Sequence, residues 1–144
     1  MKHILIYMIV LVGLLLTSCD IEISNNGDLD GFWQLQSVDT LSNNVSVDMK
    51  SQGVFWGVQK DLVEVRKYKG DSYNVYFKFD YNGNSLRLYS PYKDDRDEQD
   101  KVITDIILLR PLGVNALDES FTIEQLDDKL VISSSSLRLH FRRY

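Results

Sequence analysis

Aromatic and β-branched residues alternate with polar residues from Gly31 to the end of the chain, and this alternation restricts the fold more than any other feature. A period of two is typical of β-strands, because successive side chains point to opposite faces of a sheet. In residues 137–143, Leu137, Leu139 and Phe141 share one face and the other face is basic. No convincing helical stripe of apolar residues interrupts the pattern, so we expect an all-β fold.

Nine strands are predicted from the alternation. They cover residues 31–40, 53–59, 62–68, 73–81, 85–91, 102–110, 120–126, 129–134 and 137–143. Residues 111–119 are interpreted as one turn of helix or a loop. So many short antiparallel strands in one domain predict a closed up-and-down β-barrel of about eight to nine strands, or alternatively a β-sandwich. A tight turn at Asp127-Asp128 predicts a hairpin with Ile123 opposite Ile132.

The clearest hairpin signal is Asn82-Gly83, because both residues tolerate a positive φ. Two registers are open. A turn at Asn82-Gly83 places Phe79 opposite Leu86, and a turn one residue later places Tyr81 opposite Leu86. Both registers keep the same residues on the core side, but the first brings two basic side chains opposite one another, at some cost.

The first residues of the chain have the order of an export signal. Lys2 precedes an uncharged apolar run from Ile4 to Leu16, and small residues precede Cys19. The apolar run spans 13 residues, whereas a membrane-spanning helix needs about 20. We therefore expect residues 1–18 to be a signal peptide that is removed.

The tetrapeptide Leu-Thr-Ser-Cys that ends at Cys19 resembles the lipobox of bacterial lipoproteins. The resemblance implies that Cys19 carries lipid and becomes the first residue of an envelope protein. The outer membrane, on its periplasmic or surface face, is the expected location, and the membrane itself is a partner through this lipid. The polar residues 19–30 are interpreted as a tether and residues 31–144 as the barrel domain.

The composition supports neither catalysis nor metal binding. Cys19 is the only cysteine, and His140 is the only histidine after the signal peptide. A zinc site needs about four ligands and a nucleophile needs a positioned base, and neither set is present. The acidic stretch 94–100 lacks the glycine of a calcium loop. We predict no metal, no cofactor and no enzymatic activity, and the net charge of −5 argues against a nucleic-acid partner.

The predicted first strand opens with Gly31-Phe32-Trp33, and Gly-x-Trp at this place resembles the signature of lipocalins. The resemblance implies a barrel whose closed end is plugged by Trp33, with a basic residue of the last strand packed across it. Arg142 is the expected basic residue and Arg138 the second choice. With its lipobox, the chain is similar to lipocalin-like lipoproteins of Bacteroides-type bacteria. It lacks the disulfides of secreted lipocalins and the helix before their last strand, which argues against a deep ligand cup.

Two functions fit these features. The first is binding of a small apolar ligand in a small barrel cavity. Its candidate lining residues are Phe55, Trp56, Tyr73, Phe77, Phe79 and Tyr81. The alternative is a filled barrel that docks on an envelope protein or glycan through residues 102–110, Tyr76, Tyr89 and residues 142–144. An open apolar pocket at one barrel end would indicate the first function, and a filled barrel with an exposed apolar patch the second.

Overall fold

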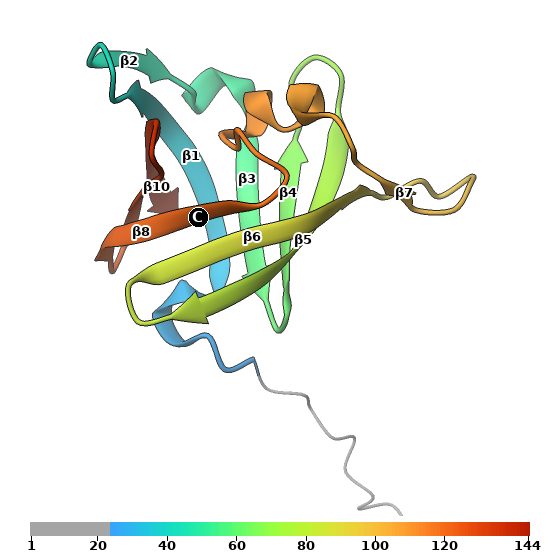
Figure 1. Cartoon of the computed structure of the whole chain (residues 1–144), viewed down its shortest axis with the longest axis horizontal. Coiled ribbons are helices and arrows are strands. Elements are labelled where there is room, and N and C mark those ends of the chain that lie inside the picture. The colour runs from blue at the N-terminus through green and yellow to red at the C-terminus, as the bar shows by residue number, and fades with distance from the viewer. Residues whose placement is uncertain (1–23) are drawn as a thin grey trace, which may run out of the picture.

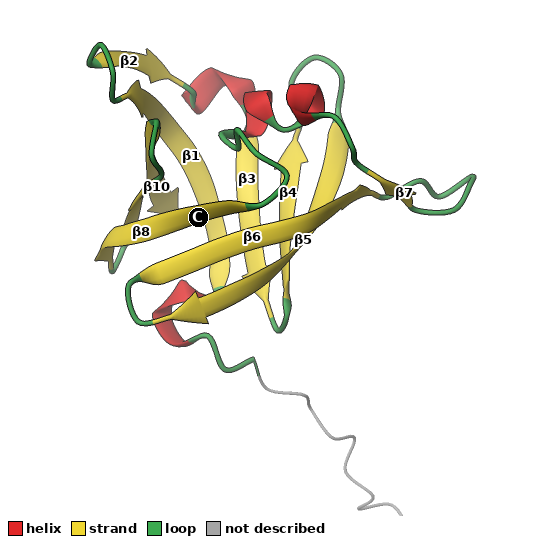
Figure 2. Cartoon of the chain, in the orientation of Figure 1, coloured by secondary structure: helices red, strands yellow, loops and turns green. Residues whose placement is uncertain are grey.

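The computed structural model describes residues 24–144, so the predicted signal peptide and Cys19 lie outside the described residues. Ten strands form one sheet, and short 3₁₀ helices (η1–η4) lie at its ends (Figures 1 and 2). The elements are η1(Gly27–Leu29), β1(Gly31–Thr40), β2(Val45–Asp48), η2(Lys50–Gln52), β3(Val54–Gln59), β4(Leu62–Lys67), β5(Tyr73–Asn82), β6(Ser85–Lys93), β7(Lys101–Val102), η3(Ile106–Leu108), η4(Arg110–Leu112), β8(Glu119–Leu126), β9(Lys129–Ser133) and β10(Leu137–Arg143).

The sheet closes on itself. Its strand order runs β10-β9-β8-β6-β5-β4-β3-β1, and β1 pairs antiparallel with β10 to complete the circle. The predicted all-β barrel is therefore confirmed, as a closed antiparallel barrel of eight strands, and the chain is not a β-sandwich. The short strands β2 and β7 are additions that pair with β1 and β6. The alternation did not predict β2, because four residues between turns give a weak pattern.

The hairpin registers follow the second of the two expected arrangements. Tyr81 lies opposite Leu86 and Asp80 opposite Arg87, so the turn is centred one residue after Asn82-Gly83. This register places an acid opposite a base, which favours the pairing. At the second predicted hairpin, Ile123 lies opposite Ile132, as expected.

The predicted strand 102–110 is wrong beyond its first residue, because β7 ends at Val102 and the chain then forms η3 and η4. The side chain of Asp105 accepts a hydrogen bond from the backbone nitrogen of Ile107 at 2.9 Å and caps η3. Gly113 ends η4 with a φ of 89°, a left-handed conformation that glycine adopts without steric cost. A short apolar run does not by itself distinguish a strand from buried helical turns.

One end of the barrel is closed by Trp33, which is fully buried. Its indole Nε1 donates a hydrogen bond to the carbonyl oxygen of Leu29 at 2.9 Å, and the guanidinium of Arg143 lies 4.2 Å from its ring centroid. Gly31 leaves space for this arginine, since a Cβ there would lie 2.9 Å from Nη1 of Arg143. Packing against Arg143 therefore explains both named residues of Gly-x-Trp: Gly31 leaves room for the guanidinium, and Trp33 provides the ring on which it lies.

The prediction that Arg142 packs on Trp33 is wrong by one residue, because Arg143 takes this place. Trp33 lies opposite Arg143 in the β1–β10 register. The side chains of Leu139 and Phe141 are buried in the barrel core, so alternation turns Arg143 to their side and Arg142 outward. Arg143 also donates hydrogen bonds to three backbone carbonyl oxygens, those of Asp28 (2.7 Å), Asp30 (2.9 Å) and Asp127 (3.3 Å).

Replacing Arg143 should therefore weaken the closed end of the barrel. Arg143→Ala removes the cation–π contact and the hydrogen bonds that join the last strand to the N-terminal arm, and we expect the free energy of unfolding to fall by about 1–2 kcal/mol. Arg142→Ala is the matched control, with an expected change within about 0.5 kcal/mol. Chemical denaturation measures both, and equal losses would contradict the assignment of Arg143.

Candidate functional site

The centre of the barrel is occupied by aromatic side chains. Trp56 on β3 contacts Phe121 on β8, with ring centroids 6.1 Å apart, and Phe141 on β10, at 5.0 Å. The strands β3 and β8 lie four places apart in a circle of eight, so they stand on opposite sides of the barrel. Contact between their side chains therefore spans the lumen, and at this level the barrel is filled.

The end of the barrel away from Trp33 is covered by the segment that carries η3 and η4 (Figure 2). Leu109, Leu112 and Val114 are fully buried. The indole Nε1 of Trp56 donates a hydrogen bond to the carbonyl oxygen of Leu112 at 3.1 Å, which ties this cover to the lumen. Tyr73 adds a second tie, because its hydroxyl donates to the carbonyl oxygen of Leu108 at 2.7 Å.

The candidate ligand-lining residues divide between the two faces of the barrel. Trp56 and Phe77 belong to the buried core. The partly buried side chains that pack against it include Tyr73, Phe79 and Tyr81. Phe55 does not line the lumen. It alternates with the buried residues Val54 and Trp56, so its side chain points to the outside of the barrel.

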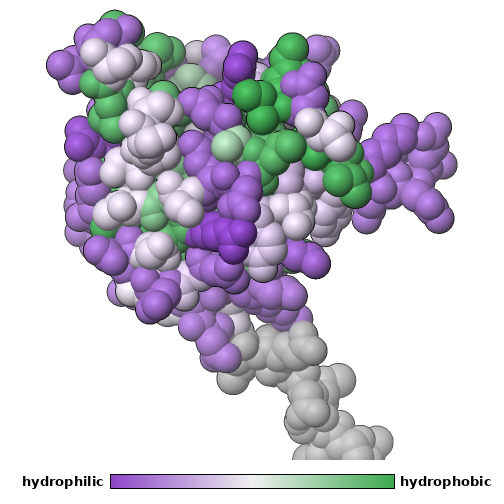
Figure 3. All heavy atoms as spheres, in the orientation of Figure 1, coloured by the Kyte–Doolittle hydropathy of each residue, from purple (hydrophilic) through white to green (hydrophobic). Residues whose placement is uncertain are grey.

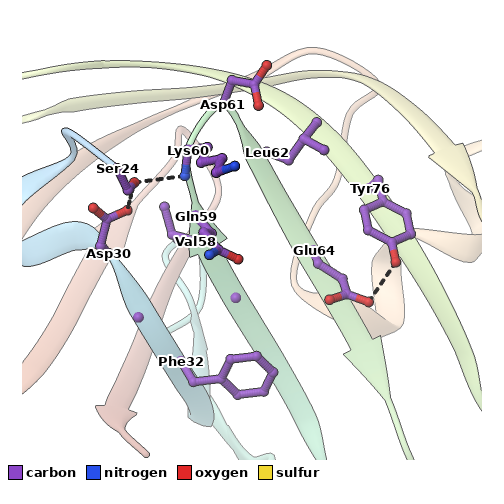
Figure 4. Close-up of a pocket in the computed structure, with 12 residues that line it drawn as sticks. Ser24, Asp30, Phe32, Val58, Gln59, Lys60, Asp61, Leu62, Glu64 and Tyr76 are labelled. Atoms are coloured by element: carbon purple, nitrogen blue, oxygen red, sulfur yellow. Dashed lines mark hydrogen bonds between the residues drawn. The ribbon is translucent and has the colours of Figure 1, made fainter. Parts of the chain in front are cut away.

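A pocket of about 570 Å³ lies on this outer face, between the N-terminal arm and the strands β1, β3, β4 and β5 (Figure 4). We call it the outer groove. Phe32, Glu64 and Tyr76 point into it from three different strands, and the turn between β3 and β4 forms one end. Its lining residues are Ser24, Asp30, Gly31, Phe32, Gly57, Val58, Gln59, Lys60, Asp61, Leu62, Glu64 and Tyr76.

The shape of the outer groove depends on a glycine and on the N-terminal arm. A Cβ at Gly57 would lie 2.8 Å from Cε2 of Phe32, so only glycine lets this ring lie flat against β3. The arm is held by Ser24, whose hydroxyl donates to Oδ1 of Asp30 at 2.7 Å and accepts from the backbone nitrogen of Lys60 at 2.8 Å. The arm therefore forms a fixed wall of the groove.

Polar side chains at the other side of the groove form one connected group. The carboxylate of Glu64 accepts hydrogen bonds from Nε and Nη2 of Arg66, at 2.7 and 2.9 Å, and from the hydroxyl of Tyr76, at 2.9 Å. Partial burial and the hydrogen bond to Glu64 raise the pKa of Tyr76 to about 12. The ring of Tyr76 stacks on that of Tyr92, with centroids 5.3 Å apart. Tyr76 is thus held in one orientation.

An aromatic cluster continues the groove across the outer face of β1 and β3. Phe55 is its centre, with ring centroids 6.0 Å from Phe32, 5.5 Å from Tyr68 and 5.1 Å from Tyr144. Tyr68 is 51% exposed and Tyr144 is 77% exposed. We call these four residues, together with the outer groove, the outer aromatic surface. The alternation of β1 and β3 could have revealed it, because it turns Phe32 and Phe55 outward.

The other residues expected at a contact surface lie elsewhere. Tyr89 packs on Arg87, whose guanidinium lies 4.8 Å from the ring centroid. Val102 and Ile107 are 75% and 66% exposed. Apolar side chains also gather at the covered end of the barrel, over η3, η4 and β7 (Figure 3).

The titratable side chains that could take part in a reaction or bind a metal form hydrogen bonds and ion pairs with their neighbours. Nε2 of His140 lies 2.7 Å from Oδ2 of Asp39 on the outer face of β10 and β1. In the acidic loop, Nζ of Lys101 lies 3.5 Å from Asp95. Within residues 24–144, no three His, Cys, Asp or Glu side chains are placed to hold a metal ion. In the same part of the chain, no helix has the length and apolarity needed to cross a membrane.

A closed eight-stranded barrel with Gly-x-Trp on its first strand and an arginine packed on that tryptophan defines a lipocalin-like protein. A family model described as a lipocalin-like domain matches residues 14–144, and the chain belongs to this family. No curated protein matches the chain.

Two solved structures have a similar fold. The crystal structure of a lipocalin-like protein from Bacteroides uniformis is 20% identical with a TM-score of 0.63, and the match covers 82% of this chain and 100% of that one. An uncharacterised protein from Bacteroides eggerthii is 18% identical with a TM-score of 0.53, over 80% of this chain and 98% of that one. At these sequence identities, the similarity to the two solved structures shows the fold alone.

The raised pKa of Tyr76 predicts a loss of stability at high pH. The pKa in the folded protein is about 12, against 10.0 for an ordinary tyrosine. The neutral phenol therefore contributes stability that is fully present below about pH 10 and is lost as the pH rises towards 12. Tyr76→Phe should reduce the drop in unfolding free energy over this range and remove the absorbance transition near pH 12. Tyr89→Phe, the control, should keep that transition.

Proposed function

We propose that this protein is a lipid-anchored interaction module of the cell envelope, which docks on a protein or glycan partner through its outer aromatic surface. The contact between Trp56 and Phe121 across the lumen is the observation that carries the proposal. It supports a barrel whose interior serves stability. A partner would then be recognised on the outside of the barrel.

The filled lumen disfavours a carrier of small apolar ligands, the first of the two functions expected from the sequence. A ligand in the lumen would have to displace the buried Leu109 and Leu112 and break the hydrogen bond from Trp56 to the cover. Close-packed interiors resist such insertion, because overpacking costs about 1–3 kcal/mol. The cover would have to open before a ligand entered.

The outer aromatic surface has the composition expected of a contact site. Tyrosine is favoured at binding hot spots, since it buries much area and keeps a polar group available. Tyr68 and Tyr144 are exposed beside the half-buried Phe32 and Phe55, which gives an apolar centre with a polar edge. Tyr76 and Glu64 add fixed hydrogen-bonding groups inside the groove.

The proposed anchor would place this surface near the membrane. Ser24 lines the outer groove and lies five residues after Cys19. Five residues span at most about 18 Å. A lipid on Cys19 would therefore hold the groove close to the lipid headgroups, where a membrane-bound partner lies within reach. The proposed role requires no catalysis and no cofactor.

Removing the exposed tyrosines should strongly reduce the capture of partners. In cells that carry the full chain, the double variant Tyr68→Ser and Tyr144→Ser should lower the yield of reproducible cross-linked partners at least about tenfold, because hot-spot residues dominate binding energy. Tyr89→Ser, an outward tyrosine on β6, is the matched control and should retain capture. Equal capture by both variants, with unchanged melting temperatures, would contradict the proposed surface.

A ligand panel tests the carrier function directly. Fatty acids, bile acids and haem should leave the melting temperature and the tryptophan fluorescence unchanged, because Trp33 and Trp56 are already enclosed by the core. A ligand that binds only the folded state raises its stability. A saturable rise in melting temperature with a fluorescence change would therefore contradict a filled barrel and support the carrier function.

A further inference from the structure

The strand β2 (Val45–Asp48) is an edge of the sheet. It pairs with β1, and the strand order of the described sheet ends with it. Figure 1 shows β2 projecting from one corner of the barrel. All four of its residues are exposed, and the apolar Val45 and Val47 are 49% and 50% exposed. Exposed edge strands are templates for pairing with another chain.

The ladder with β1 shows which backbone groups remain available. The backbone nitrogen of Met49 donates to the carbonyl oxygen of Gln36 at 2.8 Å. In an antiparallel ladder, hydrogen-bonded residues alternate with residues whose N–H and C=O point to the other edge. Val45 and Val47 therefore direct their backbone N–H and C=O groups towards β1, and Ser46 and Asp48 direct theirs away from it.

We propose that β2 pairs antiparallel with β2 of a second copy of this chain, around a two-fold axis at Val47. Ser46 of each copy would exchange backbone hydrogen bonds with Asp48 of the other, which makes four bonds in all. The two Val47 side chains would meet at the axis in a non-hydrogen-bonded pair, where cross-strand side chains are closest. The proposal is independent of the outer aromatic surface, which contains no residue of β2.

The charges of β2 are compatible with this register. Asp48 would lie opposite a serine rather than opposite the Asp48 of the second copy. Its carboxylate already accepts a hydrogen bond from the backbone nitrogen of Lys50 at 2.9 Å, which reduces the cost of bringing it to an interface. A two-fold axis uses the same edge on both copies, so pairing closes at a dimer and does not continue into a fibre.

A four-residue strand pair is a small contact. Stable interfaces bury more than about 1,000 Å², so we expect dimers that form at high protein concentration and dissociate on dilution. If the anchor in the proposed function is present, copies held on one membrane have a raised effective concentration. The pairing itself does not require the anchor.

Site-specific disulfides test the register. In the full chain purified in mild detergent, Val47→Cys should form a disulfide-linked dimer under mild oxidation, at least about fivefold faster than the controls, because paired Cα atoms about 5 Å apart suit a disulfide. The control Val45→Cys would place its thiols about 13 Å apart along the strands, too far to bridge. Val102→Cys is a more exposed valine outside β2, and the parent chain measures any background from Cys19.

A backbone variant tests the hydrogen bonds. Ser46→Pro removes an N–H that points away from β1, so the ladder between β1 and β2 keeps its hydrogen bonds. The dimer fraction in sedimentation experiments should fall about tenfold. Ser46→Ala loses the same hydroxyl and should dimerise like the parent. Cross-linking of Val47→Cys no faster than Val102→Cys, or a parent chain that stays monomeric at the highest concentration reached, would overturn the proposal.

Discussion

The pairing of the first strand with the last is the constraint on which the rest of this structure depends. β1 and β10 are far apart in sequence, and their ladder converts an open sheet into a barrel. The closure also brings Arg143 onto Trp33 and joins the C-terminal strand to the backbone of the N-terminal arm. Because closure comes from these long-range contacts, the chain holds its shape without a disulfide.

Closure of a barrel of this size leaves little room inside. Trp56 reaches across to Phe121, and the segment with η3 and η4 adds buried leucines above it. The interior then stabilises the fold, and the surfaces available for recognition are outside. The outer groove arises because Gly57 lets Phe32 lie flat on β3 while the N-terminal arm forms a wall beside it.

Much of the barrel could be predicted from residue patterns, and the failures have physical causes. Alternation and turn residues predicted the strands that form the barrel and left one hairpin with two registers, of which the structure shows the one that pairs Asp80 with Arg87. The alternation of Leu137, Leu139 and Phe141 on the last strand, continued to the next residue of the same face, would have selected Arg143 instead of Arg142. The helical turns after Val102, which bury Leu109 and Leu112, could not be predicted, because a short apolar run is compatible with a strand and with helical turns alike.

The sequence by itself determined the all-β class, the Gly-x-Trp opening of the first strand and the expectation of a lipidated Cys19, because each depends on local order of residue types. Only the tertiary structure decided that the lumen is filled, that Tyr68 and Tyr144 gather around Phe55, and that β2 ends the sheet as a free edge. These features depend on which distant segments meet, and the residue pattern of a single strand does not show which segments lie beside it.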